Sequence, residues 1–265
     1  MKSINLPKFE QQIPYNNFSF LLRDAGYEVP MEWGDNCFGR AQILGDVAKE
    51  IGLDVRYGMT ECFGHIGVIT ERRGNLHYTD PSLAQITPIP LHNVLEDDGL
   101  EEVEAFPFVR GFPSRVCASS IGTGRFRIQK YIPWGDGGYI PAKNALGEVH
   151  FDYNVNDFKP EFPRNITRIM ERSVPLREFV LRLIEEDGSE TRLVRNKDAK
   201  GGFKLISSGG QGVIQRKLNR PQDRMYMLIR LVRIADSLGV EIDDLTSLMD
   251  MAAKLDKIAR EITEL

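Results

Sequence analysis

The clearest periodic pattern in the chain lies between residues 38 and 51, where apolar side chains recur at spacings of three and four. Such spacing is typical of one face of an α-helix. The apolar positions are Ile43, Leu44, Val47, Ala48 and Ile51. Either Asp35 or Asn36 is suited to cap the start of this helix, and Gly52 to end it. The pattern therefore predicts a helix whose first turn carries Cys37.

Short segments of strand character follow this helix. The expected strands cover residues 53–57, 66–70 and 76–80. The residues between the last two, 71–75, have the composition of a hairpin turn. In an antiparallel pair joined this way, His65 and Asp80 lie at the open ends, roughly opposite one another, at the ~5 Å that separates facing Cβ atoms.

The rest of the chain predicts an antiparallel sheet or barrel and a helical end. Further strands are expected at 125–131 and 148–153, with a turn at 134–138 between them, and at 190–196, after a hairpin turn at 186–189. A helix grading into a strand is expected at 170–184, and helices at 225–238 and 243–262 with Gly239 between them. The chain is therefore expected to be α+β. We expect three parts: a helical segment with the nucleophile at 1–60, an antiparallel β-barrel with the histidine and aspartate at 61–160, and an α/β region with terminal helices at 161–265.

Composition narrows the class of protein. The 265 residues carry a net charge of −4, three cysteines and no apolar run near the roughly 20 residues that cross a bilayer. We expect a soluble cytoplasmic protein that needs no disulfide, binds no membrane and does not bind nucleic acid, since phosphate affinity requires clustered Lys and Arg. The local basic cluster of Arg125, Arg127 and Lys130 is interpreted as a solvated face.

Cys37, His65 and Asp80 are the candidate catalytic residues. A cysteine needs a base to become a strong nucleophile, and an acidic group can orient that base and stabilise its charged form. The first turn of a helix favours a thiolate, and its free N–H groups could bind an oxyanion. Each residue alone is more typical of packing or of a turn, but the three in this order favour thiol acyl-transfer chemistry.

Two other signals are weaker. Cys62 and His65 form a Cys-x-x-His pair, but no second pair of metal ligands has comparable spacing, so no metal site is expected. Cys117 is expected to be packed and not reactive.

These residues resemble the arylamine N-acetyltransferase family. Residues 13–17 (Ile-Pro-Tyr-Asn-Asn) are similar to its isoleucine-proline-aromatic stretch, and residues 34–38 (Gly-Asp-Asn-Cys-Phe) to its approach to the nucleophile. The separation of His65 from Asp80 is of the family's size, and residues 152–194 are similar to its third domain.

The resemblance implies a papain-like arrangement with a helical first domain, a β-barrel second domain and an α/β third domain. It also implies ping-pong transfer of an acyl group, usually from acetyl-CoA, through Cys37 to a small-molecule amine, with no tightly bound cofactor. Aromatic side chains near the nucleophile are the candidates for substrate contact: Trp33, Phe38 and Phe63.

The sequence also departs from that family and leaves alternatives open. The arm before Cys37 is short, the link to His65 is tight, and Pro81-Ser82-Leu83 replaces a glycine-rich turn. The donor could therefore be acyl-CoA or an acyl carrier protein. Asp80-Pro81 is also similar to the transglutaminase-like core, which would make the protein a cysteine amidase or peptidase. A third hypothesis is a non-catalytic binding protein on the same fold, with Trp33, Phe63, Tyr78 and the C-terminal helices as its contact surface.

Overall fold

The structure is a computed structural model of the chain. It describes residues 4–29, 33–59, 66–95, 99–122, 125–135, 137–142, 148–152, 178–196, 202–217 and 220–263. Two predicted site residues, His65 and Phe63, lie outside the described residues, as do Cys62 and much of the predicted segment 170–184.

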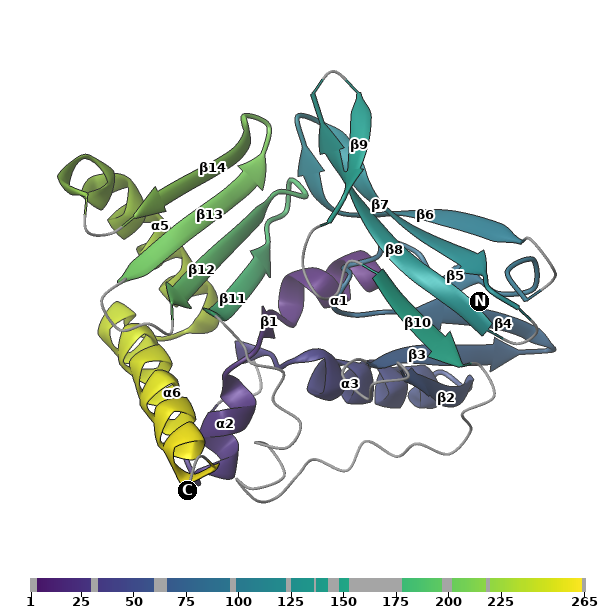
Figure 1. The fold of residues 1–265 in the computed structure, drawn as a ribbon, viewed down its shortest axis with the longest axis horizontal. Coiled ribbons are helices and arrows are strands. Elements are labelled where there is room, and N and C mark those ends of the chain that lie inside the picture. The colour runs from purple at the N-terminus through teal and green to yellow at the C-terminus, as the bar shows by residue number, and fades with distance from the viewer. Residues whose placement is uncertain are drawn as a thin grey trace.

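The N-terminal part contains three helices and one short strand (Figure 1). These elements are α1 (Leu6–Gln12), β1 (Tyr15–Asn16), α2 (Ser19–Asp24) and α3 (Cys37–Glu50). The predicted helix is confirmed as α3: the side chain of Asn36 caps its start, and Gly52 follows its C-cap with a left-handed φ of 82°. Cys37 is therefore the first residue of the helix.

A four-stranded antiparallel sheet packs against α3. Its strands are β2 (Asp54–Met59), β3 (Ile66–Arg72), β4 (Asn75–Thr79) and β5 (Ile89–Pro90). The predicted hairpin is confirmed: Arg73 and Gly74, with φ of 53° and 82°, join β3 to β4. Ile66 and Val68 of β3 pack in one apolar cluster with Leu44 of α3, so the helix covers one face of this sheet.

A second antiparallel sheet covers the other face. Its strands are β6 (Leu100–Val109), β7 (Phe112–Ser120), β8 (Arg125–Trp134), β9 (Gly138–Pro141) and β10 (Glu148–Asp152). A core that includes Tyr78, Val116 and Phe126 fills the space between the two sheets. The sheets approach at both edges, β5 near β6 and β10 near β2, but among the described strands the hydrogen-bonded pairing stays open and does not close the expected barrel.

The C-terminal part is a five-stranded sheet with two helices. It consists of β11 (Glu178–Ile184), β12 (Glu190–Asn196), β13 (Phe203–Gly209), β14 (Gly212–Lys217), α5 (Pro221–Leu238) and α6 (Ile242–Thr263). Gly239 adopts φ 65° and ends α5, as the sequence predicts. The fifth strand of this sheet is β1, which pairs with β11. The N-terminal part thus lies between the two β regions (Figure 1). The division at residues 60 and 160 stays a prediction.

Candidate active site

Cys37 lies where the sequence predicts it, at the N-terminus of a capped helix. Its side chain is 8% exposed and belongs to a cluster that includes Leu6, Ile66 and Val68. A helix N-terminus carries the positive end of the peptide dipoles, which favours a negative charge on sulfur. The Cys37 sulfur therefore lies at the positive end of α3 and is largely shielded from bulk water.

The N–H groups of the first turn are used differently from the expectation. The side-chain Oδ1 of Asn36 accepts from the backbone N–H of Phe38 at 3.0 Å and of Gly39 at 3.2 Å. These two donors are therefore committed to the helix cap. The expectation that free N–H groups of this turn bind an oxyanion is wrong for Phe38 and Gly39, because both N–H groups already donate to the Asn36 side chain.

Two of the sequence segments that carry the family resemblance, residues 13–17 and 34–38, lie against each other. The N–H of Asp35 donates to the carbonyl of Pro14, and the N–H of Asn16 donates to the carbonyl of Asp35. Gly34, with φ 74°, makes this contact possible, because an added Cβ would lie 1.7 Å from the Pro14 oxygen. The Asp35 carboxylate also pairs with Arg23. The approach to Cys37 is thus held on β1 from one side and on α2 from the other.

Asp80 is fully buried just after β4, and both of its carboxylate oxygens have donors. The hydroxyl of Tyr78 donates to Oδ2 at 3.1 Å, and the N–H of Ser82 donates to Oδ1 at 2.8 Å. The backbone N–H of Asp80 donates to the side-chain oxygen of Gln85. A carboxylate held at both oxygens has a defined direction, which an orienting residue requires.

Gly67 creates the space for this arrangement. Val68 pairs with Thr79 in the β3–β4 register, so the next position places Asp80 across from Gly67. An added Cβ at Gly67 would lie 2.3 Å from the ring of Tyr78. The missing side chain therefore lets the Tyr78 ring lie across β3, with its hydroxyl reaching Asp80.

Two tyrosines connect the sulfur with the carboxylate electrostatically. Burial raises the pKa of Tyr78, and the negative charge of Asp80, the hydrogen bond to it and a negative charge on Cys37 raise it further. Burial also raises the pKa of Tyr15, with Cys37 as the second cause and Asp80 as a smaller one, while Arg182 and Arg40 act in the opposite direction. Charges on Cys37 and on Asp80 therefore both act on these two tyrosines, which stay protonated at neutral pH.

The remaining predicted contact residues have different positions. Phe38 is partly buried and packs on the cluster of Cys37. Trp33 is 2% exposed and lies in a core cluster with Phe18 and Leu22, so its indole offers no surface to a substrate. The sequence pattern missed this because an aromatic residue near a nucleophile looks the same in a core and in a pocket.

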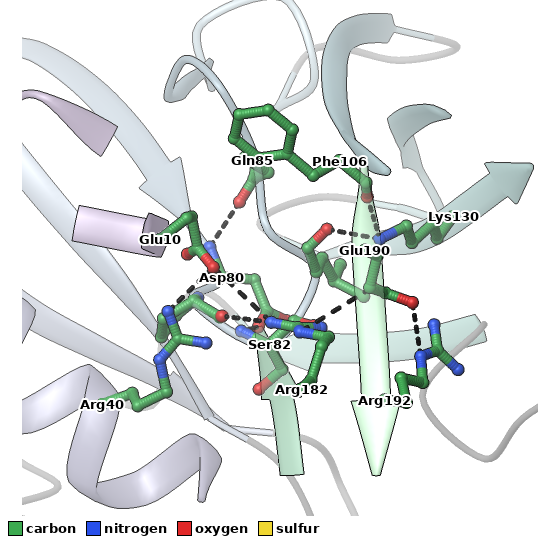
Figure 2. A network of polar contacts seen from close by, with 12 residues as sticks. Glu10, Arg40, Asp80, Ser82, Gln85, Phe106, Lys130, Arg182, Glu190 and Arg192 are labelled. Atoms are coloured by element: carbon green, nitrogen blue, oxygen red, sulfur yellow. Dashed lines mark hydrogen bonds and ion pairs between the residues drawn. The ribbon is translucent and has the colours of Figure 1, made fainter. Parts of the chain in front are cut away.

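A cluster of six charged side chains surrounds the turn that follows Asp80 (Figure 2). The members of this ion cluster are Glu10, Arg40, Lys130, Arg182 and Glu190, which are buried, and Arg192, whose side chain is partly exposed. Arg40 binds Glu10 at 2.8 Å, and Arg182 lies 3.5 Å from the same carboxylate. Burial alone would raise the pKa of Glu190, but the charges of Arg192, Arg182 and Lys130 lower it.

Lys130 corrects one expectation. It is 6% exposed, and its Nζ donates to the carbonyls of Leu83 at 2.8 Å and Phe106 at 2.6 Å. It is therefore not part of a solvated basic face. Burial lowers its pKa to about 7, and the charge of Arg182 adds to this effect. The alternation of β8 could have indicated this, because Phe126, Ile128 and Lys130 point to the same buried face.

Within the described ranges, no group of three or more His, Cys, Asp and Glu side chains is arranged to hold a metal ion. Across those same residues, no helix has the length and apolar character to cross a membrane.

Comparison with known proteins gives a match in structure only. No protein-family model and no curated protein sequence matches the chain. An arylamine N-acetyltransferase from Mycobacterium marinum, solved in complex with CoA, aligns over 94% of this chain and 90% of its own, with 13% identity and a TM-score of 0.55. The chain has the arylamine N-acetyltransferase fold.

Other structures of this fold agree. The enzyme from Bacillus anthracis covers 89% of both chains at 11% identity and a TM-score of 0.54. The enzyme from Bacillus cereus covers 84% of this chain and 86% of its own at 12% identity and a TM-score of 0.51, and it is described with a Cys-His-Glu catalytic triad. The predicted resemblance in fold is thus confirmed. At sequence identities of 11–13%, the similarity shows a common fold and nothing further.

Proposed function

We propose that this protein is a cysteine-dependent N-acyltransferase, in which Cys37 takes an acyl group from a thioester and passes it to an amine. The observation that carries the proposal is geometric: Cys37 is the first residue of α3, and the buried Asp80 carboxylate accepts a hydrogen bond at each of its two oxygens. The arylamine N-acetyltransferase fold supports the same chemistry.

In the proposed reaction His65 carries the proton. It removes the proton from the Cys37 thiol, and the sulfur attacks the thioester carbonyl. The donor thiolate leaves, takes the proton from His65, and an acyl-Cys37 thioester remains. The amine then attacks this carbonyl, its proton passes to His65, and Cys37 leaves as a thiolate that is reprotonated. Asp80 orients the imidazole and stabilises its charged form through both half-reactions.

Acetyl-CoA is the donor that we propose first, because one enzyme of this fold was solved in complex with CoA. An acyl group on a carrier protein is the alternative donor, since Pro81-Ser82-Leu83 differs from the family's glycine-rich turn. The acceptor is a small-molecule amine, and Phe38 and Phe63 are the proposed substrate contacts.

The decisive test is intact mass after incubation with acetyl-CoA, followed by peptide mapping. We expect one acetyl group on Cys37, discharged by an arylamine, and no increment in Cys37→Ser. Cys117 is an internal control: burial and its hydrogen bond to Glu102 raise its pKa to about 12, so it should remain unlabelled at neutral pH. No acyl-enzyme with either acetyl-CoA or an acylated carrier protein would refute the transferase.

Mass analysis of Cys37 with other reagents separates the alternatives. Acylation of Cys37 by a peptide or amide, with release of amine and no uptake from CoA, would indicate the amidase. A Cys37 that iodoacetamide labels no faster than free cysteine would indicate a binding protein. Trp33 and Tyr78, which were to form the contact surface of such a protein, are 2% and 0% exposed, and this counts against it.

A further inference from the structure

The carbonyl groups of three consecutive residues after Asp80 accept hydrogen bonds from two buried basic side chains, Arg182 and Lys130. Figure 2 shows Arg182 beside Ser82. Arg182 donates from Nη2 to the carbonyl of Pro81 at 3.3 Å and from Nη1 to that of Ser82 at 2.5 Å. Lys130 donates to the carbonyl of Leu83 at 2.8 Å. One guanidinium and one amine therefore hold three successive peptide groups of the turn.

Peptide geometry connects this grip to the Asp80 carboxylate. The carbonyl of Pro81 and the N–H of Ser82 belong to one planar peptide group and point in opposite directions. When Arg182 holds that carbonyl, it fixes the direction of the N–H that donates to Asp80 Oδ1 at 2.8 Å. The next peptide repeats the pattern: Arg182 holds the carbonyl of Ser82, and the N–H of Leu83 donates to the carbonyl of Asp80 at 3.1 Å.

The two cations come from the two other sheets of the molecule. Arg182 lies on β11, and Lys130 lies on β8 and also binds the carbonyl of Phe106 on β6. Arg182 further lies over the ring of Tyr15, 5.1 Å from its centroid. The carboxylates of Glu10 and Glu190 offset the buried positive charge. The turn is therefore held by groups whose own positions the folded sheets determine.

We propose that Arg182 is a positioning residue of the active site, which fixes the Asp80 carboxylate through the Pro81–Ser82 peptide while Lys130 holds the following peptide. The proposal rests on the proposed function, in which Asp80 orients His65. It adds two residues, far from Asp80 in sequence, that act through it.

The test measures the rate of Cys37 acylation by acetyl-CoA in Arg182→Met and Lys130→Met. Without the hydrogen bonds from Arg182 or Lys130 the turn can move and the Asp80 carboxylate can rotate. Misplacement of a catalytic group by about 1 Å can lower the reaction rate on the order of 100-fold. We expect a loss of about 10- to 100-fold for Arg182→Met and a smaller one for Lys130→Met. Arg56→Met is the control, because Arg56 is exposed on β2, pairs with Glu71 and lies outside the ion cluster, and it should lose less than about threefold.

A double-mutant cycle with Asp80→Asn separates positioning from general structure. If Arg182 acts through Asp80, Arg182→Met should cost less than about threefold once Asp80→Asn is present. An undiminished loss in that background would overturn the proposal. The pH profile of Cys37 alkylation by iodoacetamide should shift in the same direction in Arg182→Met and Asp80→Asn, and an unshifted profile in Arg182→Met would also overturn it.

Failure of this proposal differs from failure of the proposed function. If Asp80→Asn is strongly impaired while Arg182→Met and Lys130→Met are both fully active, only the positioning role is refuted. If Asp80→Asn is itself fully active, the orienting role falls and the positioning role falls with it. Should Arg182→Met not fold by circular dichroism, Arg182→Lys replaces it in every measurement above, because it keeps the charge and loses the two-pronged geometry.

Discussion

The two ends of β4 are closed by two different kinds of turn. Before β4, Arg73 and Gly74 both adopt left-handed φ angles, which match the twist of the two strands they join. After β4, residues 80–85 form a buried turn, here called the Asp80 turn. One side chain, Arg182, holds the carbonyls of Ser82 and Pro81, from which it is 100 and 101 residues distant in the sequence. The first turn is determined by its own residues, and the second by the rest of the molecule.

The difference indicates where sequence variation has functional consequences. At the Arg73–Gly74 turn, Gly74 has open space around it, because an added Cβ would meet nothing within 4 Å. The Asp80 turn has a donor or acceptor from a different element at nearly every peptide. A change at the first turn should therefore alter stability alone, and a change at the second should alter catalysis.

The largest expected effect is at the Asp80 turn itself. Asp80→Asn should keep the fold and lower kcat/KM for acetyl transfer by about 10⁴, by analogy with the corresponding change in serine proteases. Steady-state rates with an arylamine acceptor measure this. Asp46→Asn, an exposed aspartate on α3, is the control and should keep full activity. A fully active Asp80→Asn would show that the orienting residue is assigned wrongly.

The next effect is a pH dependence of stability caused by Lys130. Its pKa is about 7 in the fold, against about 10.4 for an unfolded lysine, so between these values the unfolded chain binds a proton that the folded chain does not. The free energy of unfolding should therefore rise with pH from about 7 to 10, by at most about 1.4 kcal/mol per pH unit. Below about pH 7 the contribution is constant.

Urea unfolding of wild type and Lys130→Met at several pH values checks this. The charged groups that act on Lys130 are Arg182, Arg192, Glu190 and Glu10, and they are the same in both proteins. The difference in unfolding free energy between wild type and Lys130→Met therefore reports the contribution of Lys130. If this difference did not change with pH above 7, the prediction would be contradicted. The neutral amine retains two hydrogens for its two carbonyl partners, so the turn should stay intact above pH 7.

A smaller effect is expected at Tyr78. Tyr78→Phe removes the hydroxyl that donates to Asp80 and leaves the ring in place against Phe126, 5.5 Å between centroids. A hydrogen bond to a charged group contributes about 1.5–3 kcal/mol. We expect about a tenfold fall in kcat/KM. Tyr139→Phe removes a hydroxyl that binds the Pro113 carbonyl at the same 3.1 Å, and it should leave the rate unchanged.

The smallest effect is expected at the Arg73–Gly74 turn. Gly74→Ala places a side chain at φ 82° and should lower the free energy of unfolding by about 1 kcal/mol. Acetyl-transfer rates should match those of wild type. A loss of activity while the protein is fully folded would mean that the two ends of β4 are coupled.

Much of the fold could be predicted because its signals are local. The apolar spacing of α3, its Asn36 cap and the Gly239 stop all act within a few residues. Two features could not be predicted: that the sheets β2–β5 and β6–β10 do not join into a closed barrel, and that β1 pairs with β11. Strand pairing between distant segments leaves no short-range pattern in the sequence.

The candidate site divides in the same way. The sequence places Cys37 at the start of a helix and Asp80 at the end of a strand. It does not reveal that Trp33 is buried, that the Asn36 cap uses two first-turn N–H groups, or that Lys130 is buried while Arg127, three positions earlier on the same strand, is exposed. His65 lies outside the described residues, so its part in the triad stays a prediction.

By itself, the sequence determined which residues can begin a helix and close a hairpin, because those properties depend on side chains within about one turn of each other. Only the tertiary structure decided that Arg182 and Lys130 meet the carbonyls after Asp80. That meeting depends on three sheets packing together, and a buried cation on a strand is stable only where the fold brings oxygen atoms to it.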